Sequence, residues 1–269
     1  MAAKRANQSD RSKASRSDGG AVLVTGASGL LGGALVRRLL ASGRSVIALC
    51  HSTRSAKLCL EKTPEAASSG QLRTVVIDLM KPDALGKSRK ALLPHAAQIG
   101  GFVHCARSRD NLAVDGLADE KQWADEFRLG VSIPFDLAQL LAAAPGTGLK
   151  RVVLVGSMYG IVAVNPNLYP TGMKKAPAHY GVVRGAIPQA TRELAASLIA
   201  KGINVNAVTV GGIEGRVSPA FKRRYAKFCP QGRMLSVEEA VQPIEFLLSA
   251  AASGIVGHNL VVDGGWSIW

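Results

Sequence analysis

The stretch AVLVTGASGLLG at residues 21–32 joins a short apolar run to a glycine-rich turn. Its first five residues have the continuous apolar character of a buried strand, and the segment near 30–42 repeats leucines at helical spacing. Between them, Gly26 permits a tight turn, Gly29 lets the backbone approach a ligand, and Gly32 lets the helix lie close to the sheet. Such a turn, placed between the first strand and the first helix, predicts a site for the pyrophosphate of a dinucleotide. We expect this site to be lined by Gly26, Ser28, Gly29, Leu30, Leu31 and Gly32.

Further apolar runs alternate with helix-length segments along the rest of the chain. Strand, helix and strand in regular succession predict right-handed crossovers and a parallel sheet with helices on both faces. The sequence therefore indicates an α/β fold, a doubly wound three-layer α/β/α sheet of the Rossmann type with about seven strands, in one domain over 21–269. We expect strands at 21–25, 45–50, 73–78, 101–105, 151–156, 203–209 and 258–262. We expect helices near 30–42, 82–97, 121–143, 180–201 and 237–251.

Composition and charge narrow the class of protein. The chain has 269 residues, of which 47% are hydrophobic and 19% charged, as in a globular protein. Residues 1–20 are polar and carry five basic side chains against two acidic ones, so we expect a disordered tail, with a mitochondrial transit peptide as the alternative. No apolar run is long enough to span a membrane, and the four cysteines show no paired spacing. We therefore expect a reduced, cytoplasmic protein without a membrane span.

The net charge of +14 is compatible with several kinds of binding partner. Such an excess could attract nucleic acid, an anionic surface or an anionic substrate. Because no nucleic-acid-binding motif accompanies the charge, we expect a small-molecule substrate, and nucleic acid is the less favoured partner. A protein that binds nucleic acid or an anionic surface through its tail and its excess charge is retained as a further hypothesis.

The residues after the second predicted strand bear on the choice of cofactor. In this fold, an acidic residue at that strand end binds the ribose hydroxyls of NAD. The sequence has none there and places Ser52, Thr53 and Arg54 instead, which suits the 2′-phosphate of NADP. These residues favour NADP(H), and NAD(H) is the alternative. Further cofactor contacts are expected at the ends of the third and fourth strands, from Asp78, Leu79, Cys105, Ala106 and Arg107.

Several motifs together resemble the short-chain dehydrogenase/reductase family across about residues 20–269. They are the turn TGASGLLG, Asp78-Leu79, Ser157 in VLVGSMYG, Tyr180 in HYGVVRGAI, and the ending VDGGWSIW. In that family a tyrosine passes a proton to or from the substrate oxygen during hydride transfer, and a serine orients that oxygen. A lysine four residues after the tyrosine holds the nicotinamide ribose. The resemblance therefore implies that Tyr180 is the general acid or base and that Ser157 is the orienting hydroxyl.

Two positions depart from the family pattern. The lysine position is Arg184, and the position of an asparagine that fixes a water in the proton relay is Gly130. Arg184 keeps a positive charge that would favour a tyrosinate, but its guanidinium does not give up a proton. The resemblance implies an NADP(H)-dependent oxidoreductase of carbonyls or alcohols whose activity is slow or specialised. The alternative is a cofactor-binding protein with little or no turnover. The resemblance adds Tyr180, Arg184, Gly211, Gly212 and Ile213 to the cofactor contacts.

The segment 213–233 is expected to cover the substrate as a lid, as the corresponding segment does in the family. Its six basic residues against one glutamate favour an anionic substrate, and a solvated amphipathic helix is the alternative. The stretch between Ser157 and Tyr180 is similar to family members that process sugars, which suggests a sugar-linked substrate. We expect this stretch to bring Tyr159 and Tyr169 near the mouth of the substrate pocket.

The resemblance also implies an assembly. Family members usually form dimers or tetramers, and the apolar ending Trp266-Ser267-Ile268-Trp269 supports a homodimer or homotetramer. No metal site is expected, because the histidines show no ligand spacing.

Overall fold

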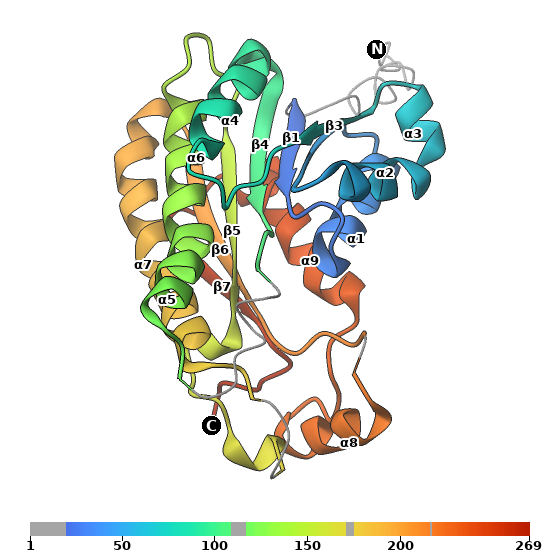
Figure 1. The fold of residues 1–269 in the computed structure, drawn as a ribbon, viewed down its shortest axis with the longest axis vertical. Coiled ribbons are helices and arrows are strands. Elements are labelled where there is room, and N and C mark those ends of the chain that lie inside the picture. Colours follow the sequence, from blue (N-terminus) through green and yellow to red (C-terminus); the bar gives the residue numbers. More distant parts are fainter. Residues whose placement is uncertain (1–19, 109–116, 171–174, 216) are drawn as a thin grey trace, which may run out of the picture.

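The computed structural model describes residues 20–108, 117–170, 175–215 and 217–269. Its centre is one sheet of seven parallel strands in the order β3-β2-β1-β4-β5-β6-β7 (Figure 1). The strands are β1 (Ala21–Thr25), β2 (Val46–Cys50), β3 (Leu72–Val76), β4 (Ile99–His104), β5 (Arg151–Ser157), β6 (Asn204–Val210) and β7 (Asn259–Val262). The tail expected at 1–20 lies outside the described residues except for Gly20, and so does Arg216 of the expected lid.

Helices cover both faces of this sheet (Figure 1). One face packs against α1 (Leu30–Ala41), α2 (Thr53–Glu61) and α9 (Val237–Leu247). The other face packs against α4 (Ala84–Leu92), α6 (Ile133–Ala142) and α7 (Ala178–Leu198). Three further helices are α3 (Pro64–Ser68), α5 (Glu120–Phe127) and α8 (Pro219–Phe228). Because side chains alternate along a strand, Val22 and Val24 enter the first apolar layer while Leu23 enters the second.

The strand order reverses between β1 and β4, which are neighbours in the sheet although two strands separate them in sequence. At such a switch point the connections leave in opposite directions, and a crevice opens beyond the carboxyl ends of the strands. The turn at 26–29 follows β1 at this place, so the topology puts the glycine-rich turn where ligands of doubly wound sheets bind.

The seven predicted strands are confirmed, each within two residues of the expected bounds. The helix expected over 121–143 is instead divided into α5, a π-helical turn (Arg128–Ser132) and α6. Pro134 explains the division, because it lacks the N–H that would bond to the carbonyl one turn earlier. Within the described residues, none of the helices is long and apolar enough to cross a membrane.

A third apolar cluster joins α8 to the C-terminal segment through their side chains. Both segments lie beyond the carboxyl ends of the strands (Figure 1). Tyr225 of α8 is buried and stacks on Trp266, with the ring centroids 4.4 Å apart. Asp263 fixes the turn before Trp266, because its carboxylate accepts hydrogen bonds from Gly265 N at 2.9 Å and from Ser267 N at 2.9 Å. The segment expected to act as a lid is therefore packed onto the C-terminal turn in this structure.

Candidate active site

The glycine-rich turn packs tightly against the ends of β1 and β4. Gly26 has φ of +66°, and a Cβ there would lie 2.8 Å from the Cα of Ala106. A Cβ on Gly32 would lie 2.3 Å from the carbonyl oxygen of Gly26, so only glycine lets α1 begin so close to the turn. The turn and the ends of β1 and β4 thus approach each other at backbone distance.

The first turn of α1 presents N–H groups without a competing side chain. Gly29 occupies the N-cap position, no side chain caps the helix, and its first turn contains no acidic residue. The positive end of the helix dipole is therefore available to an anion. Leu30 is 56% exposed at this opening. These features fit the pyrophosphate of a nicotinamide dinucleotide.

The end of β2 leads into α2 through a capping box. The Ser52 hydroxyl accepts a hydrogen bond from Ser55 N at 3.3 Å, and Ser52 N donates to the Ser55 hydroxyl at 3.0 Å. Thr53 and Arg54 are exposed at the start of this helix. Ser52 is thus held by its own helix, whereas Thr53 and Arg54 face solvent at the carboxyl end of β2.

The ends of β3 and β4 complete the sheet edge. Asp78 accepts a hydrogen bond from Met80 N at 3.0 Å, and the neighbouring Leu79 is buried. Cys105 is half-buried, and burial raises the pKa of its thiol to about 12, so it stays protonated. Ala106 is half-buried and Arg107 is exposed.

Close glycine contacts join the Ser157 strand end to the Tyr180 helix. Ser157 ends β5, and the short 3-10 turn after it (Met158–Gly160) packs on α7. A Cβ on Gly160 would lie 2.5 Å from the backbone of Arg184, and one on Gly181 would lie 3.0 Å from the carbonyl oxygen of Tyr159. This backbone-to-backbone packing brings the strand end with Ser157 to the first turns of the helix with Tyr180.

A pair of phenols lies beside these two residues. The hydroxyls of Tyr159 and Tyr169 are 2.8 Å apart and share a hydrogen bond. Burial, above all, raises the pKa of both phenols, and the nearby Tyr180 adds to the rise. Tyr159 and Tyr169 were expected at the pocket mouth, and that placement stays a prediction.

Arg184 forms a buried ion pair that the sequence did not suggest. Its Nη2 donates to Glu126 Oε1 at 2.7 Å, and the two side chains are 4% and 1% exposed. The guanidinium carbon lies 4.9 Å from the centroid of the Tyr180 ring. The Nε of Arg184 has no acceptor among the residues that the structure describes.

Gly130 adjoins this guanidinium. A Cβ at Gly130 would lie 3.8 Å from Cζ and Nη1 of Arg184 and 2.8 Å from Cγ1 of Val183. The two departures from the family pattern are therefore neighbours in space, and the missing side chain at residue 130 leaves room for the larger cation at residue 184.

His104 connects β1 to the π-helical turn. Its Nδ1 lies 2.9 Å from the Thr25 hydroxyl, and its Nε2 lies 2.9 Å from the Leu129 carbonyl oxygen. Since a carbonyl only accepts, Nε2 carries the proton and Nδ1 accepts from Thr25. Burial, helped by the charge of Arg184, lowers the pKa of His104 to about 3, so the ring is neutral near pH 7.

This shift predicts a pH-dependent stability. An unfolded histidine binds its proton near pH 6.5, so the stabilisation is complete above that pH and is lost as the pH falls towards 3. Between these values His104 should lower the free energy of unfolding by about 1.4 kcal/mol per pH unit. Denaturant unfolding of the His104→Gln variant, whose amide can keep both hydrogen bonds, should lack this component. Parallel pH profiles for the two proteins would contradict the assignment.

The segment after β6 is held by α8 and by its own hydrogen bonds. Gly211, Gly212 and Ile213 are half-buried, and Gly212 N donates to the Tyr225 hydroxyl at 3.0 Å. Lys222 pairs with Glu214, and Arg233 pairs with Glu239 at 2.7 Å. Part of the positive charge expected to face a substrate is therefore neutralised within the protein.

Sequence reasoning missed Glu126, His104 and the glycines that join β5 to α7. Glu126 lies within a predicted helix and has no spacing motif that links it to Arg184, 58 residues later.

Within the described parts of the chain, no group of three or more His, Cys, Asp or Glu side chains could hold a metal ion.

Comparisons with known proteins agree with this architecture. The model of the family described as enoyl-(acyl carrier protein) reductase matches residues 26–267. Galactitol 2-dehydrogenase (L-tagatose-forming) of Cereibacter sphaeroides is 26% identical over 264 residues, covering 94% of this chain and 97% of that protein. A short-chain dehydrogenase from Leptospira borgpetersenii, solved with bound NAD+, superposes with a TM-score of 0.79 at 22% identity, covering 99% of this chain and 98% of that one. An actinorhodin polyketide ketoreductase solved with NADPH gives a TM-score of 0.77 at 22% identity, covering 94% of this chain and 98% of that one.

Proposed function

Because this chain belongs to the short-chain dehydrogenase/reductase family, an oxidoreductase family, we propose that it is an NADP(H)-dependent oxidoreductase that interconverts a carbonyl and an alcohol. The observation that carries the proposal is the glycine packing of Gly160 against α7, because it brings the end of β5, with Ser157, to the helix that carries Tyr180. The uncapped start of α1 supports cofactor binding at the neighbouring switch point.

Each residue has a role that its surroundings support. The bound cofactor supplies or accepts the hydride. In the reduction, the Tyr180 phenol donates its proton to the substrate oxygen, and the Ser157 hydroxyl donates a hydrogen bond that orients that oxygen. The Arg184 guanidinium carbon lies 4.9 Å from the centroid of the Tyr180 ring, so its charge helps to hold the ring in place through a cation–π contact. Since a guanidinium does not release its proton, the half-buried Tyr180 recovers a proton from solvent.

The preference for NADP(H) rests on the end of β2. No acidic residue follows Cys50 before α2, and the exposed Arg54 can bind a 2′-phosphate.

Replacing Arg54 by glutamine should weaken NADPH binding by about tenfold, a change of about 1.4 kcal/mol in binding free energy, and leave NADH binding nearly unchanged. Titrations that follow cofactor fluorescence measure both affinities. Lys57→Gln, on the same helix, is the matched control because Lys57 pairs with Glu61. Equal losses for NADPH and NADH would contradict the assignment.

The substrate side favours a hydroxylated or sugar-linked compound. Tyr159 and Tyr169 present a hydroxyl pair beside Tyr180, and paired hydroxyls can exchange hydrogen bonds with a polyol. Galactitol 2-dehydrogenase, a relative that covers nearly the whole chain, acts on a polyol as its name states. An anionic substrate is the second candidate, because Arg223 and Lys227 of α8 are exposed and could bind an anion.

A cofactor-binding protein without turnover is the second candidate function. The observation that favours it is the buried Arg184–Glu126 pair, which draws the guanidinium towards α5. The Arg184→Lys, Gly130→Asn double variant restores the family residues at both positions. Reduction of a panel of carbonyl compounds by the wild type with NADPH supports the oxidoreductase. Cofactor-dependent thermal stabilisation without turnover in the wild type, with turnover in the double variant, would select the second candidate.

A further inference from the structure

Two cysteines face each other at the carboxyl end of β2. Cys50 is the last residue of β2, and Cys59 lies in the last turn of α2. Their sulfur atoms are 3.7 Å apart, and the side chains are only 1% and 5% exposed. The two residues are nine positions apart in the sequence and form no recognisable motif, so the fold alone pairs them.

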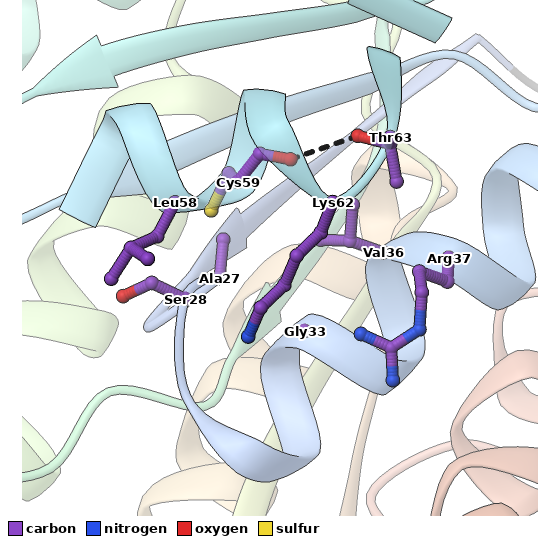
Figure 2. A pocket seen from close by; sticks show the side chains of 9 residues that line it. All are labelled: Ala27, Ser28, Gly33, Val36, Arg37, Leu58, Cys59, Lys62 and Thr63. Carbon is purple, nitrogen blue, oxygen red and sulfur yellow. Dashed lines mark hydrogen bonds between the residues drawn. The ribbon is translucent and has the colours of Figure 1, made fainter. Parts of the chain in front are cut away.

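A shallow pocket between α1 and α2 reaches the Cys59 side of this pair. Figure 2 shows Cys59 on the α2 wall and the Lys62 side chain extending across the pocket towards Gly33. The pocket is lined by Ala27, Ser28, Gly33, Val36, Arg37, Leu58, Cys59, Lys62 and Thr63. A small uncharged molecule of the size of water or peroxide would therefore approach the pair from the Cys59 side, since Cys59 lines the pocket and Cys50 is not among the lining residues.

The surroundings of the two thiols differ. The hydrogen bond with Cys50, together with the charge of Lys62, lowers the pKa of Cys59 despite its burial. The same hydrogen bond and burial raise the pKa of Cys50. Because Cys59 lines the pocket that the Lys62 side chain crosses and Cys50 does not, Cys59 is the nucleophile of the pair and Cys50 the thiol that closes the bridge.

We propose that Cys50 and Cys59 are a dithiol oxidation site that closes to an intrachain disulfide when it meets hydrogen peroxide. The Cys59 thiolate attacks one peroxide oxygen, the O–O bond breaks, and the second oxygen leaves as water after taking a proton from solvent. The Cys50 sulfur then attacks the Cys59 sulfenic acid, an S–S bond forms, and the S–O bond breaks. The departing oxygen takes the Cys50 proton and leaves as a second water. Two thiols are oxidised by two electrons, and one peroxide is reduced.

Oxidation would alter the end of β2. A disulfide holds its sulfurs about 2.0 Å apart, so closing it brings the two sulfurs about 1.7 Å closer than in the dithiol and ties α2 covalently to the end of β2. Ser52, Thr53 and Arg54 lie on the chain between the two cysteines, inside the loop that the bond would close. This consequence rests on the proposed function, since these residues are the proposed 2′-phosphate contacts, and it predicts weaker NADPH binding after oxidation. The disulfide itself does not depend on that function.

The test counts thiols in the folded full-length protein before and after treatment with hydrogen peroxide. The four free cysteines should fall to two per chain, and peptide mass mapping without reductant should find Cys50 joined to Cys59, with a loss of two hydrogens. Reductant should restore all four. Thiol counts that stay at four, or a disulfide through Cys105 or Cys229, would overturn the proposal.

Serine variants distinguish the role of Cys59, which reacts with peroxide, from that of Cys50, which closes the bridge. Cys50→Ser should leave Cys59 as a sulfenic acid that a dimedone reagent traps, and Cys59→Ser should remove both the trap and the disulfide. Cys229→Ser, a buried cysteine outside the pair, is the matched control and should still close the bridge. With the disulfide mapped, the Kd for NADPH should rise about threefold or more in the wild type and not in Cys50→Ser. An unchanged Kd would overturn the coupling to the cofactor crevice.

Discussion

Replacing Tyr180 by phenylalanine should lower kcat/KM for carbonyl reduction by about a hundredfold to ten-thousandfold, the usual contribution of a general acid. The change removes only the phenolic hydroxyl. The ring, which lies under the Arg184 guanidinium, and the α7 backbone, which packs on Gly160, both stay. The expected loss is therefore chemical and not structural.

Steady-state kinetics with NADPH and the best carbonyl substrate measure this loss. NADPH affinity and thermal stability serve as internal controls, and both should change little, because the hydroxyl is not part of the packed core. A Tyr180→Phe enzyme with wild-type kcat/KM would show that another group delivers the proton. Tyr159, whose hydroxyl is bonded to that of Tyr169, would be the next residue to examine.

Replacing Glu126 by alanine should destabilise the fold by about 3–5 kcal/mol, the typical penalty for leaving a buried charge without its partner. Arg184 is 4% exposed, and its ion pair of 2.7 Å with Glu126 balances its charge. In the variant the guanidinium must either stay unpaired in the core or push α7 outwards. Urea unfolding measures the loss, and Glu120→Ala, on the exposed face of α5, is the matched control.

A double variant distinguishes the ion pair from simple packing. Glu126→Leu combined with Arg184→Met removes both charges and keeps the volume, and such replacements are often neutral or stabilising. We therefore expect stability near that of the wild type while turnover falls, because the cation beside Tyr180 is gone. If Glu126→Ala were as stable as the wild type, the buried pair would not be a structural element of this protein.

The sheet and the glycine-rich turn could be predicted because their causes are local. Each strand is a continuous apolar run, and the turn at 26–32 carries its glycines in a fixed spacing between a strand and a helix. The helix α2 was not predicted. Its sequence TRSAKLCLE carries a mixed pattern, and its capping box uses Ser55 in place of the usual glutamate.

The interior of the candidate site depends on distant contacts and could not be predicted in the same way. The sequence indicated Arg184 and Gly130 as departures from the family, yet their meaning depends on Glu126, which reaches Arg184 only because α5 packs on α7. His104 likewise joins Thr25 of β1, 79 residues earlier, to Leu129 of the π-helical turn, 25 residues later. The cysteine pair at the end of β2 is another contact that spacing alone does not reveal.

The central claim is that the open start of α1 holds the diphosphate of the cofactor, and an NADPH titration of wild type and Gly29→Asp tests it most directly. Gly29 has extended backbone angles at the N-cap, where aspartate is favoured, so α1 should stay folded. Its carboxylate would repel the diphosphate and compete for the same N–H groups. We expect saturable NADPH binding by the wild type and at least about tenfold weaker binding by the variant at equal thermal stability. Equal affinity for NADPH in the two proteins would contradict the account.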